Sequence, residues 1–194
     1  WDAASLHDGL PAGVWRLDDP VGLLPVDQAG LGWALADYRF NRYLKPEPGP
    51  AKRLALPAGA DMDRATLLAA CIAQARDLIT TPANDLGPAE LEAAVAEVAK
   101  AYGAEFTSIV GDELLTQGFP TIHAVGRAAV RAPRLLDLRW GDPAARKLTL
   151  VGKGVCFDTG GLDLKTSAGM LMMKKDMGGA GLMLALARAV MGLG

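Results

Sequence analysis

The sequence predicts an α/β protein, and three observations lead to that prediction. From residue 82 onward, short apolar runs typical of strands alternate with helical patterns, as expected where helices layer on a sheet. The 194 residues are 51% hydrophobic and 22% charged, which is ordinary for a globular protein of one or two domains. The segment KPEPGPAKR at 45–53 predicts a linker, because its prolines and glycine oppose regular structure.

The first 60 residues are rich in glycine and proline and predict only short elements. VGLLPVD at 21–27 and LALPAG at 54–59 are typical of short buried strands. Between them, apolar residues at helical spacing predict a helix within 31–44.

Two longer helices follow. DMDRATLLAACIAQARDLI at 61–79 carries an apolar stripe with helical period, and Pro82 ends this pattern. LGPAELEAAVAEVAKAYG at 86–103 has Pro88 where a first helical turn favours it and Gly103 where a helix stops. We therefore expect two helices separated by a short loop.

The remaining chain predicts alternating short strands and helices. We expect strands at EFTSIV (105–110), TIHAVG (121–126), RLLDLRW (134–140) and KLTLVGKGV (147–155), a short helix at DELLTQG (112–118) and a final apolar helix at GGAGLMLALARAV (178–190).

Charge and cysteine content exclude several classes of function. The formal net charge is −2, so we expect neither a nucleic-acid nor a membrane partner. No apolar run predicts a membrane span, and the first residues lack the pattern of a signal peptide. Cys71 and Cys156 lie far apart and predict free thiols in a reducing, cytoplasmic setting. The start at Trp1 and the end just after a helical pattern lead us to expect the middle of a longer protein.

The most informative stretch is VGKGVCFDTGGLDLK at 151–165, which places two lysines and two aspartates among four glycines. It overlaps the end of an apolar run that predicts buried sheet, and MMKKDMGGAG follows soon afterwards. Charge beside a buried sheet is costly unless it is paired or bound to a metal. The question is therefore what these charges contact.

Phosphate-binding loops and a cysteine nucleophile explain the stretch poorly. A P-loop pattern fails because Gly154 follows Lys153 where Ser or Thr is required, and a dinucleotide fingerprint fails at Phe157. Cys156 as a nucleophile would need a base such as His123, and its apolar neighbours favour a small buried thiol.

A metal site fits better. Asp158 comes where the predicted strand ends and Asp176 precedes the final helix, and carboxylates at such places bind hard or borderline cations. Lys153 is either a ligand that loses its proton to the metal or a charge that pairs with Asp158. Lys165 is a candidate cation for polarising a carbonyl. The plain alternative is a solvated surface loop and helix start.

The stretch VGKGVCFDTGGLDLKTSAGMLMMKKDMGGA at 151–180 resembles the signature of the leucyl aminopeptidase family, the M17 cytosol aminopeptidases. Further similarity runs through GWALADYRFNRY (32–43), ARDLITTPANDLGPAEL (75–91) and HAVGRAAVRAPRLLDLRW (123–140). The resemblance thus covers most of the chain from about residue 31 onward.

The resemblance implies a role for each matching residue. Lys153, Asp158 and Asp176 correspond to metal ligands, with Asp158 touching both metals, and Lys165 corresponds to the catalytic lysine near the scissile carbonyl. Two methionines fall in the segment that lines the side-chain pocket of the substrate, although core packing explains them equally well: Met170 and Met173.

This sequence departs from the family pattern in two ways. Thr166 stands where the family usually has proline after the catalytic lysine, which leaves the backbone φ of this loop unfixed. Two metals need about eight ligand contacts, and this chain offers three clear side chains. The family completes the site with a later N-T-D-A-E-G-R segment, which the sequence lacks.

The resemblance also implies a domain arrangement. Residues 1–60 correspond to the end of an N-terminal α/β domain and its linker, and 61–81 to an interdomain helix. Residues 82–194 correspond to the first half of a catalytic α/β domain, with a mixed central sheet flanked by helices.

The function implied is that of an aminopeptidase releasing N-terminal residues, leucine by family habit, from peptide substrates. The resemblance implies hydrolysis by a water that two divalent ions activate, with zinc as the expected metal and manganese or magnesium at a looser position. A bicarbonate held by the absent arginine is expected to relay a proton, and the family assembles as a homo-oligomer, a hexamer. Two alternatives stay open: a DNA-binding or structural family member without catalysis, and an inactive relative kept for its oligomer.

Overall fold

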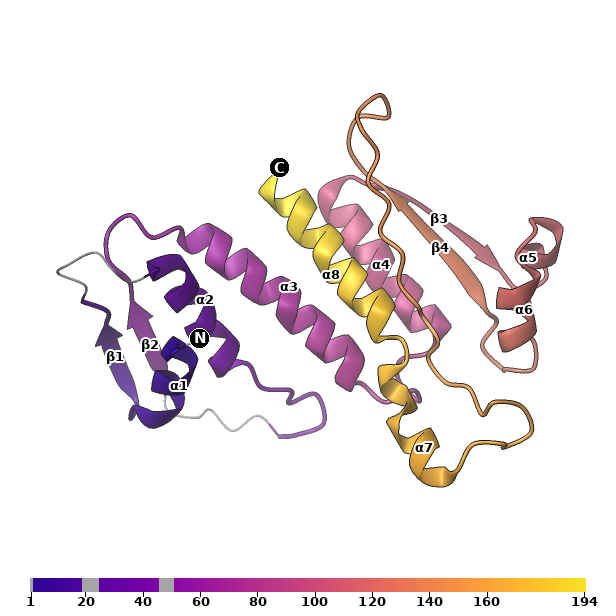
Figure 1. The fold of residues 1–194 in the computed structure, drawn as a ribbon, viewed down its shortest axis with the longest axis horizontal. Coiled ribbons are helices and arrows are strands. Elements are labelled where there is room, and N and C mark those ends of the chain that lie inside the picture. The colour runs from indigo at the N-terminus through magenta and orange to yellow at the C-terminus, as the bar shows by residue number, and fades with distance from the viewer. Residues whose placement is uncertain (1, 19–24, 46–50) are drawn as a thin grey trace. The chain divides into compact units, whose positions relative to one another are not determined.

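The computed structural model describes residues 2–18, 25–45 and 51–194, which form two compact units. The first unit ends at Gln74 and the second begins at Ala75, so helix α3 (Met62–Thr80) contributes residues to both. Figure 1 shows helices combined with small sheets in each unit, which confirms the α/β class. The finer division predicted at residues 60 and 81 stays a prediction.

The first unit pairs two short strands with two helices. Its elements are α1 (Asp2–Gly9), β1 (Gly13–Arg16), α2 (Val26–Asp37), β2 (Lys52–Ala55) and the start of α3. The strands run parallel in the register Gly13 to Lys52 and Arg16 to Ala55.

A buried histidine holds α1 against α2 in this unit. His7 is 2% exposed, and its ring meets the Trp33 ring edge-on with centroids 4.9 Å apart. Its Nδ1 lies 3.3 Å from Asp8 Oδ1 and its Nε2 lies 3.3 Å from Asp37 Oδ1. The sequence pattern does not predict α1, because this helix is short and its stability comes from such tertiary contacts rather than from an apolar stripe.

The second unit contains the longer elements. They are the end of α3, α4 (Pro88–Tyr102), β3 (Glu105–Val110), α5 (Glu113–Thr116), α6 (Pro120–Gly126), β4 (Arg134–Arg139), α7 (Ser167–Leu171), η1 (Met172–Lys175) and α8 (Gly178–Leu193). Strands β3 and β4 are antiparallel, with Glu105 opposite Arg139 and Val110 opposite Arg134.

The core of the second unit lies between α4 and α8, which run side by side in Figure 1. Val98 of α4 packs with Leu184 and Met191 of α8 in one buried cluster. A second cluster joins the start of both helices to the loop before α7 and contains Leu86, Leu91, Cys156 and Met177. These contacts bury the apolar faces that the sequence predicts for both helices.

Several predicted elements are confirmed. Strand β3 occupies the predicted 105–110, and β4 lies within the predicted 134–140. The helices predicted at 61–79, 86–103 and 178–190 correspond to α3, α4 and α8.

Other predicted elements are wrong or shifted. The segment 121–126 lies in helix α6 rather than in a strand, because Pro120 opens the helix and alternation over so few residues is a weak signal. Helix α2 begins earlier than the predicted 31–44 and ends at Asp37, and β2 lies at 52–55 rather than at 54–59. Residues 21–24 of the first predicted strand lie outside the described residues.

The predicted strand at 147–155 is the most informative miss. These residues are not assigned to a strand or a helix. A strand exists only where a neighbouring chain accepts and donates its ladder hydrogen bonds, and no strand in the described part of the chain pairs with this segment. Leu148 and Val151 are accordingly 77% and 83% exposed.

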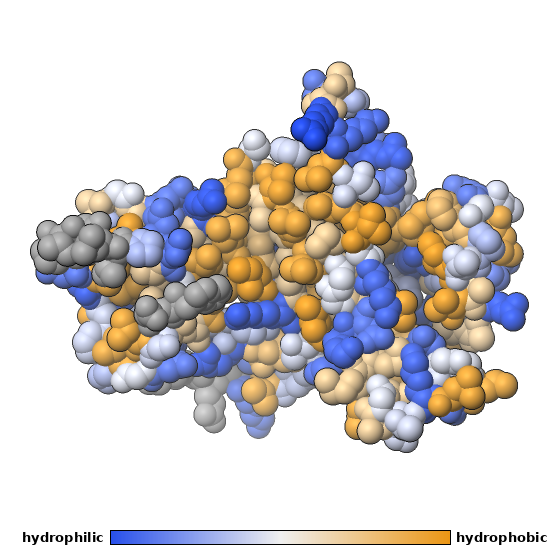
Figure 2. Space-filling view, viewed as in Figure 1, coloured by the Kyte–Doolittle hydropathy of each residue, from blue (hydrophilic) through white to orange (hydrophobic). Residues whose placement is uncertain are grey.

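The helical stretch Ser167–Leu193 is long and apolar enough, by length and composition, to cross a membrane. The core helix of a soluble protein passes the same test, so this is weak evidence. Figure 2 shows apolar residues over α8, where Leu182, Leu186 and Val190 form an exposed stripe.

The segment that carries the charged residues approaches α8 through glycine. A Cβ on Gly152 would lie 2.5 Å from the Gly179 carbonyl oxygen and 2.6 Å from Ala180 Cα. The Ala180 N–H donates to the Lys153 carbonyl oxygen at 2.9 Å. Only a residue without a side chain permits this approach. The contact fixes the backbone of Lys153 against the first turn of α8.

We expect Gly152→Ala to lower the free energy of unfolding by about 1–3 kcal/mol, because its methyl group overlaps the backbone of α8. Gly154→Ala is the matched control, since a Cβ there meets Leu91 Cδ2 at 3.4 Å and Ala180 Cβ at 3.6 Å, which are ordinary contacts. Urea unfolding of both variants measures the difference. Equal stability of the two variants would contradict the close approach.

Candidate metal centre

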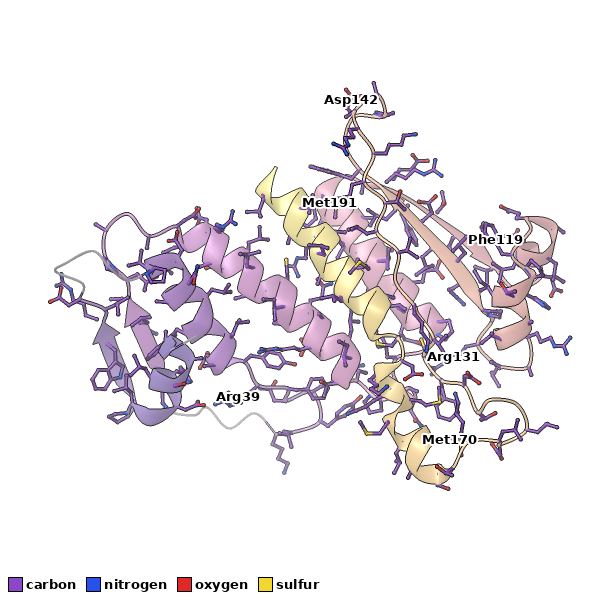
Figure 3. All side chains as sticks on the ribbon, in the orientation of Figure 1. Arg39, Phe119, Arg131, Asp142, Met170 and Met191 are labelled. Carbon is purple, nitrogen blue, oxygen red and sulfur yellow. The ribbon has the colours of Figure 1, made fainter. Side chains whose placement is uncertain are left out.

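The predicted site residues come from two neighbouring stretches of the second unit. Lys153 and Asp158 lie on the extended segment before the glycine loop, and Lys165 ends that loop. Asp176 lies between η1 and α8. Figure 3 shows Met170 on α7, beside this loop.

Asp158 and Lys165 form one ion pair of the site. Lys165 Nζ lies 3.2 Å from Asp158 Oδ2 and also donates to the Asp158 carbonyl oxygen at 3.0 Å. The Gly160 N–H donates to Asp158 Oδ1 at 2.6 Å. This backbone hydrogen bond and the Lys165 ammonium hold the pKa of the Asp158 carboxyl below its usual value. The carboxylate is therefore stabilised in the charged form that a cation requires.

Asp176 forms the second charged group. Its Oδ1 lies 3.1 Å from Lys175 Nζ and its Oδ2 lies 3.2 Å from Lys153 Nζ. Hydrogen bonds from Lys175 and then Lys153 lower the pKa of the Asp176 carboxyl. The charge of Lys153 also lowers the pKa of Asp158. Lys153 thus acts on both aspartates: it forms an ion pair with Asp176, and its charge stabilises the ionised form of Asp158.

The loop between Asp158 and Lys165 is a left-handed turn. Four consecutive residues have positive φ: Gly160 (77°), Gly161 (98°), Leu162 (44°) and Asp163 (58°). Positive φ is sterically unfavourable for leucine, whereas glycine adopts it readily. The turn closes with the Lys165 N–H donating to the Thr159 carbonyl oxygen at 3.0 Å, which brings Lys165 back to Asp158.

Thr166, which departs from the family's usual proline, has a structural role here. Its Oγ1 accepts a hydrogen bond from the Gly169 N–H at 3.2 Å and caps α7. The cap provides a local constraint directly after Lys165 in place of the fixed φ of proline.

The two predicted pocket methionines differ in environment. Met173 is 3% exposed, and its Sδ lies 3.6 Å from Lys165 Nζ. Met170 is half-buried on α7. Their predicted role in substrate binding stays a prediction.

A cysteine–histidine pair is not formed. Cys156 is 6% exposed, and burial raises the pKa of its thiol to about 11, so the nucleophilic thiolate is scarce near neutral pH. His123 Nε2 instead lies 3.0 Å from Asp112 Oδ1. The buried thiol favoured by the sequence is confirmed.

The donor set suits part of a cation site. Asp158 and Asp176 offer carboxylate oxygens, which hard and borderline divalent ions accept, and Lys153 offers a nitrogen once deprotonated. Within residues 2–18, 25–45 and 51–194, no group of three or more His, Cys, Asp or Glu side chains suits a metal ion. The described side chains therefore fit a partial coordination sphere.

Sequence spacing missed Lys175 as a partner of Asp176 and Met173 as a contact of Lys165. Lys175 directly precedes Asp176, but adjacent residues face one another only in particular backbone conformations. In the structure, Lys175 ends the 3₁₀ turn η1 and Asp176 follows it directly; the sequence pattern does not predict this turn.

Comparison with known proteins matches residues 73–194 to the model of the cytosol aminopeptidase family, catalytic domain. A probable cytosol aminopeptidase from Corynebacterium diphtheriae is 34% identical over 94% of this chain and 39% of its own length. The chain thus spans about two fifths of that relative.

Two solved structures support the same assignment. The crystal structure of cytosol aminopeptidase from Coxiella burnetii matches with a TM-score of 0.91 and 48% identity, over 100% of this chain and 42% of that one. The bottromycin maturation enzyme BotP in complex with Mn matches with a TM-score of 0.81 and 32% identity, over 98% of this chain and 43% of that one. The chain belongs to the cytosol aminopeptidase family, M17.

Proposed function

We propose that the complete protein is a metal-dependent aminopeptidase that releases N-terminal amino acids from peptides. The observation that carries this proposal is the paired cluster in which Lys165 contacts Asp158 and Lys153 contacts Asp176, within a chain of this family. The relatives named cytosol aminopeptidases support a peptidase function. No specific observation favours a DNA-binding or structural protein without catalysis.

We assign the metal-holding role to Lys153, Asp158 and Asp176. The pKa of the Asp158 carboxyl is lowered, so this side chain is ionised at neutral pH. Its two carboxylate oxygens allow it to serve as a ligand shared by two ions. The manganese complex of BotP supports dependence on a divalent ion. We propose two ions, zinc or manganese, with magnesium as a further candidate, and further ligands from parts of the protein outside this chain.

Such ions, when bound, supply an activated water and positive charge for the carbonyl oxygen of the peptide. The chain's own contribution is Lys165. Its ammonium lies within the cluster and half-buried, where a fixed positive charge stabilises a developing oxyanion more than it would in water. Met170 and Met173 are proposed to contact the substrate side chain.

Finer properties are proposals by family analogy. They are preference for leucine, a bicarbonate as proton relay, assembly as a hexamer and a cytoplasmic location. The relatives' name, cytosol aminopeptidase, supports the last of these.

The first test separates metal binding from turnover. In the complete protein, Asp158→Asn should lose bound metal and at least about hundredfold in leucine amide hydrolysis, because it removes a charged ligand. Lys165→Ala should keep its metal and lose about 10²–10³-fold in kcat, because it removes a charge from the oxyanion.

Metal content by elemental analysis and steady-state kinetics measure both effects. Asp163→Asn is the matched control, since Asp163 has positive φ that asparagine tolerates and lies in the same loop. Normal turnover by Lys165→Ala would show that the lysine has been given the wrong role.

Removal of divalent ions should abolish hydrolysis by the complete protein, because the water is activated only by the bound ions. Dialysis against EDTA followed by addition of Zn²⁺ or Mn²⁺ should remove and then restore leucine amide hydrolysis. An undiminished rate in protein shown to be metal-free would rule out the proposed chemistry.

Cys156→Ala should keep nearly full activity, because a thiol with a pKa of about 11 is only about one part in a thousand ionised at pH 8. Iodoacetamide at pH 8 should likewise leave the rate unchanged. Cys71→Ala is the control for loss of an equally buried thiol. Loss of activity in Cys156→Ala but not in Cys71→Ala, with normal metal content in both, would support the hypothesis that Cys156 is a nucleophile.

A further inference from the structure

The ammonium of Lys165 has three neighbours that accept hydrogen bonds. Its Nζ lies 3.0 Å from the Asp158 carbonyl oxygen, 3.2 Å from Asp158 Oδ2 and 3.6 Å from Met173 Sδ. A lysine ammonium carries three protons and accepts none. The three acceptors therefore match all of its donors, with the Met173 thioether as the weakest of them.

Only one of these acceptors has a competing use. The Asp158 carboxylate is the proposed metal ligand, whereas the Asp158 carbonyl and the Met173 thioether are not. Met173 is 3% exposed, so its side chain is confined by packing and its sulfur has little freedom to move away. The carbonyl and the sulfur can thus restrain Lys165 independently of the carboxylate.

The position of Met173 connects both halves of the site. Its side chain contacts Lys165, and its carbonyl oxygen accepts a hydrogen bond from the Asp176 N–H at 2.9 Å. Met173 lies in η1, the short turn that leads into Asp176. A single buried residue therefore touches the proposed catalytic lysine and orients the backbone of a proposed metal ligand.

We propose that Met173 is a positioning residue for Lys165, whose thioether sulfur holds the ammonium toward the reacting carbonyl oxygen. This inference rests on the proposed function of Lys165. It gives Met173 a role in addition to any contact with the substrate side chain, because the group that acts on Lys165 is the sulfur lone pair rather than the hydrophobic surface.

The test replaces the sulfur with little change in volume. Met173→Leu removes the acceptor, and exchange of Met for Leu is usually well tolerated. Met172→Leu is the matched control, since Met172 lies in the same turn and is 56% exposed. In the metal-loaded complete protein, we expect Met173→Leu to lower kcat about two- to tenfold, equally for leucine amide and alanine amide and whatever its effect on KM.

A second readout does not depend on turnover. The ¹H–¹⁵N signal of the Lys165 ammonium should shift or broaden in Met173→Leu and stay unchanged in Met172→Leu, because only the first loses a hydrogen-bond acceptor. Rates are divided by the folded fraction from circular dichroism, which keeps the comparison valid if a variant partly unfolds. In a Lys165→Ala background, Met173→Leu should cause no further loss of kcat.

Three outcomes would overturn the inference. They are an unchanged Lys165 signal in Met173→Leu, a loss of kcat that persists undiminished in the Lys165→Ala background, and a change confined to the KM ratio of leucine amide to alanine amide, which identifies a pocket wall. Full turnover by Lys165→Ala is a separate result, because it removes the proposed role of the lysine whatever Met173 does.

Discussion

The contact between the backbone at Gly152 and Lys153 and the first turn of α8 is the constraint on which the charged cluster depends. A hydrogen bond from Ala180 N–H to the Lys153 carbonyl oxygen fixes the distance, and the absent side chain of Gly152 permits it. Asp176 lies just before the same helix. Because Lys153 and Asp176 are fixed to one helix start, their side chains meet without a long-range sheet.

The charged side chains of the cluster contribute little to the stability of the fold, which favours a functional reason for their presence. The side chains of Lys153, Lys165 and Asp158 are between 37% and 61% exposed. Ion pairs of this kind contribute little to stability, because water screens them and long side chains lose entropy. Asp176 is less exposed, at 19%, and accordingly has two lysine partners. Three ammonium groups surround two carboxylates, so the cluster of these five side chains has a formal charge of +1.

The sequence predicts elements well where the signal is local. The alternating pattern of 105–110 and the apolar stripe of 86–103 specify β3 and α4, because side-chain period alone distinguishes them. The pattern at 147–155 predicts a strand equally well, yet no strand among residues 2–18, 25–45 and 51–194 pairs with it, because strand formation also needs a neighbouring strand. Local periodicity carries no information about that partner. Likewise, the sequence predicts Asp158 and Asp176 as ligands of one metal site, which stays a prediction, and its spacing does not identify Lys175 as a contact of Asp176 or Met173 as a contact of Lys165.

The contacts of the charged cluster are local in the sequence. Every contact of Lys153, Asp158, Lys165, Met173 and Asp176 described above joins residues within the single segment from Gly152 to Ala180. Such short loops close at low entropic cost, so the geometry of this part requires few distant contacts. A full coordination sphere requires more ligands than these residues offer. The local segment thus sets where these charges lie, whereas a full coordination sphere would need ligands in addition to them.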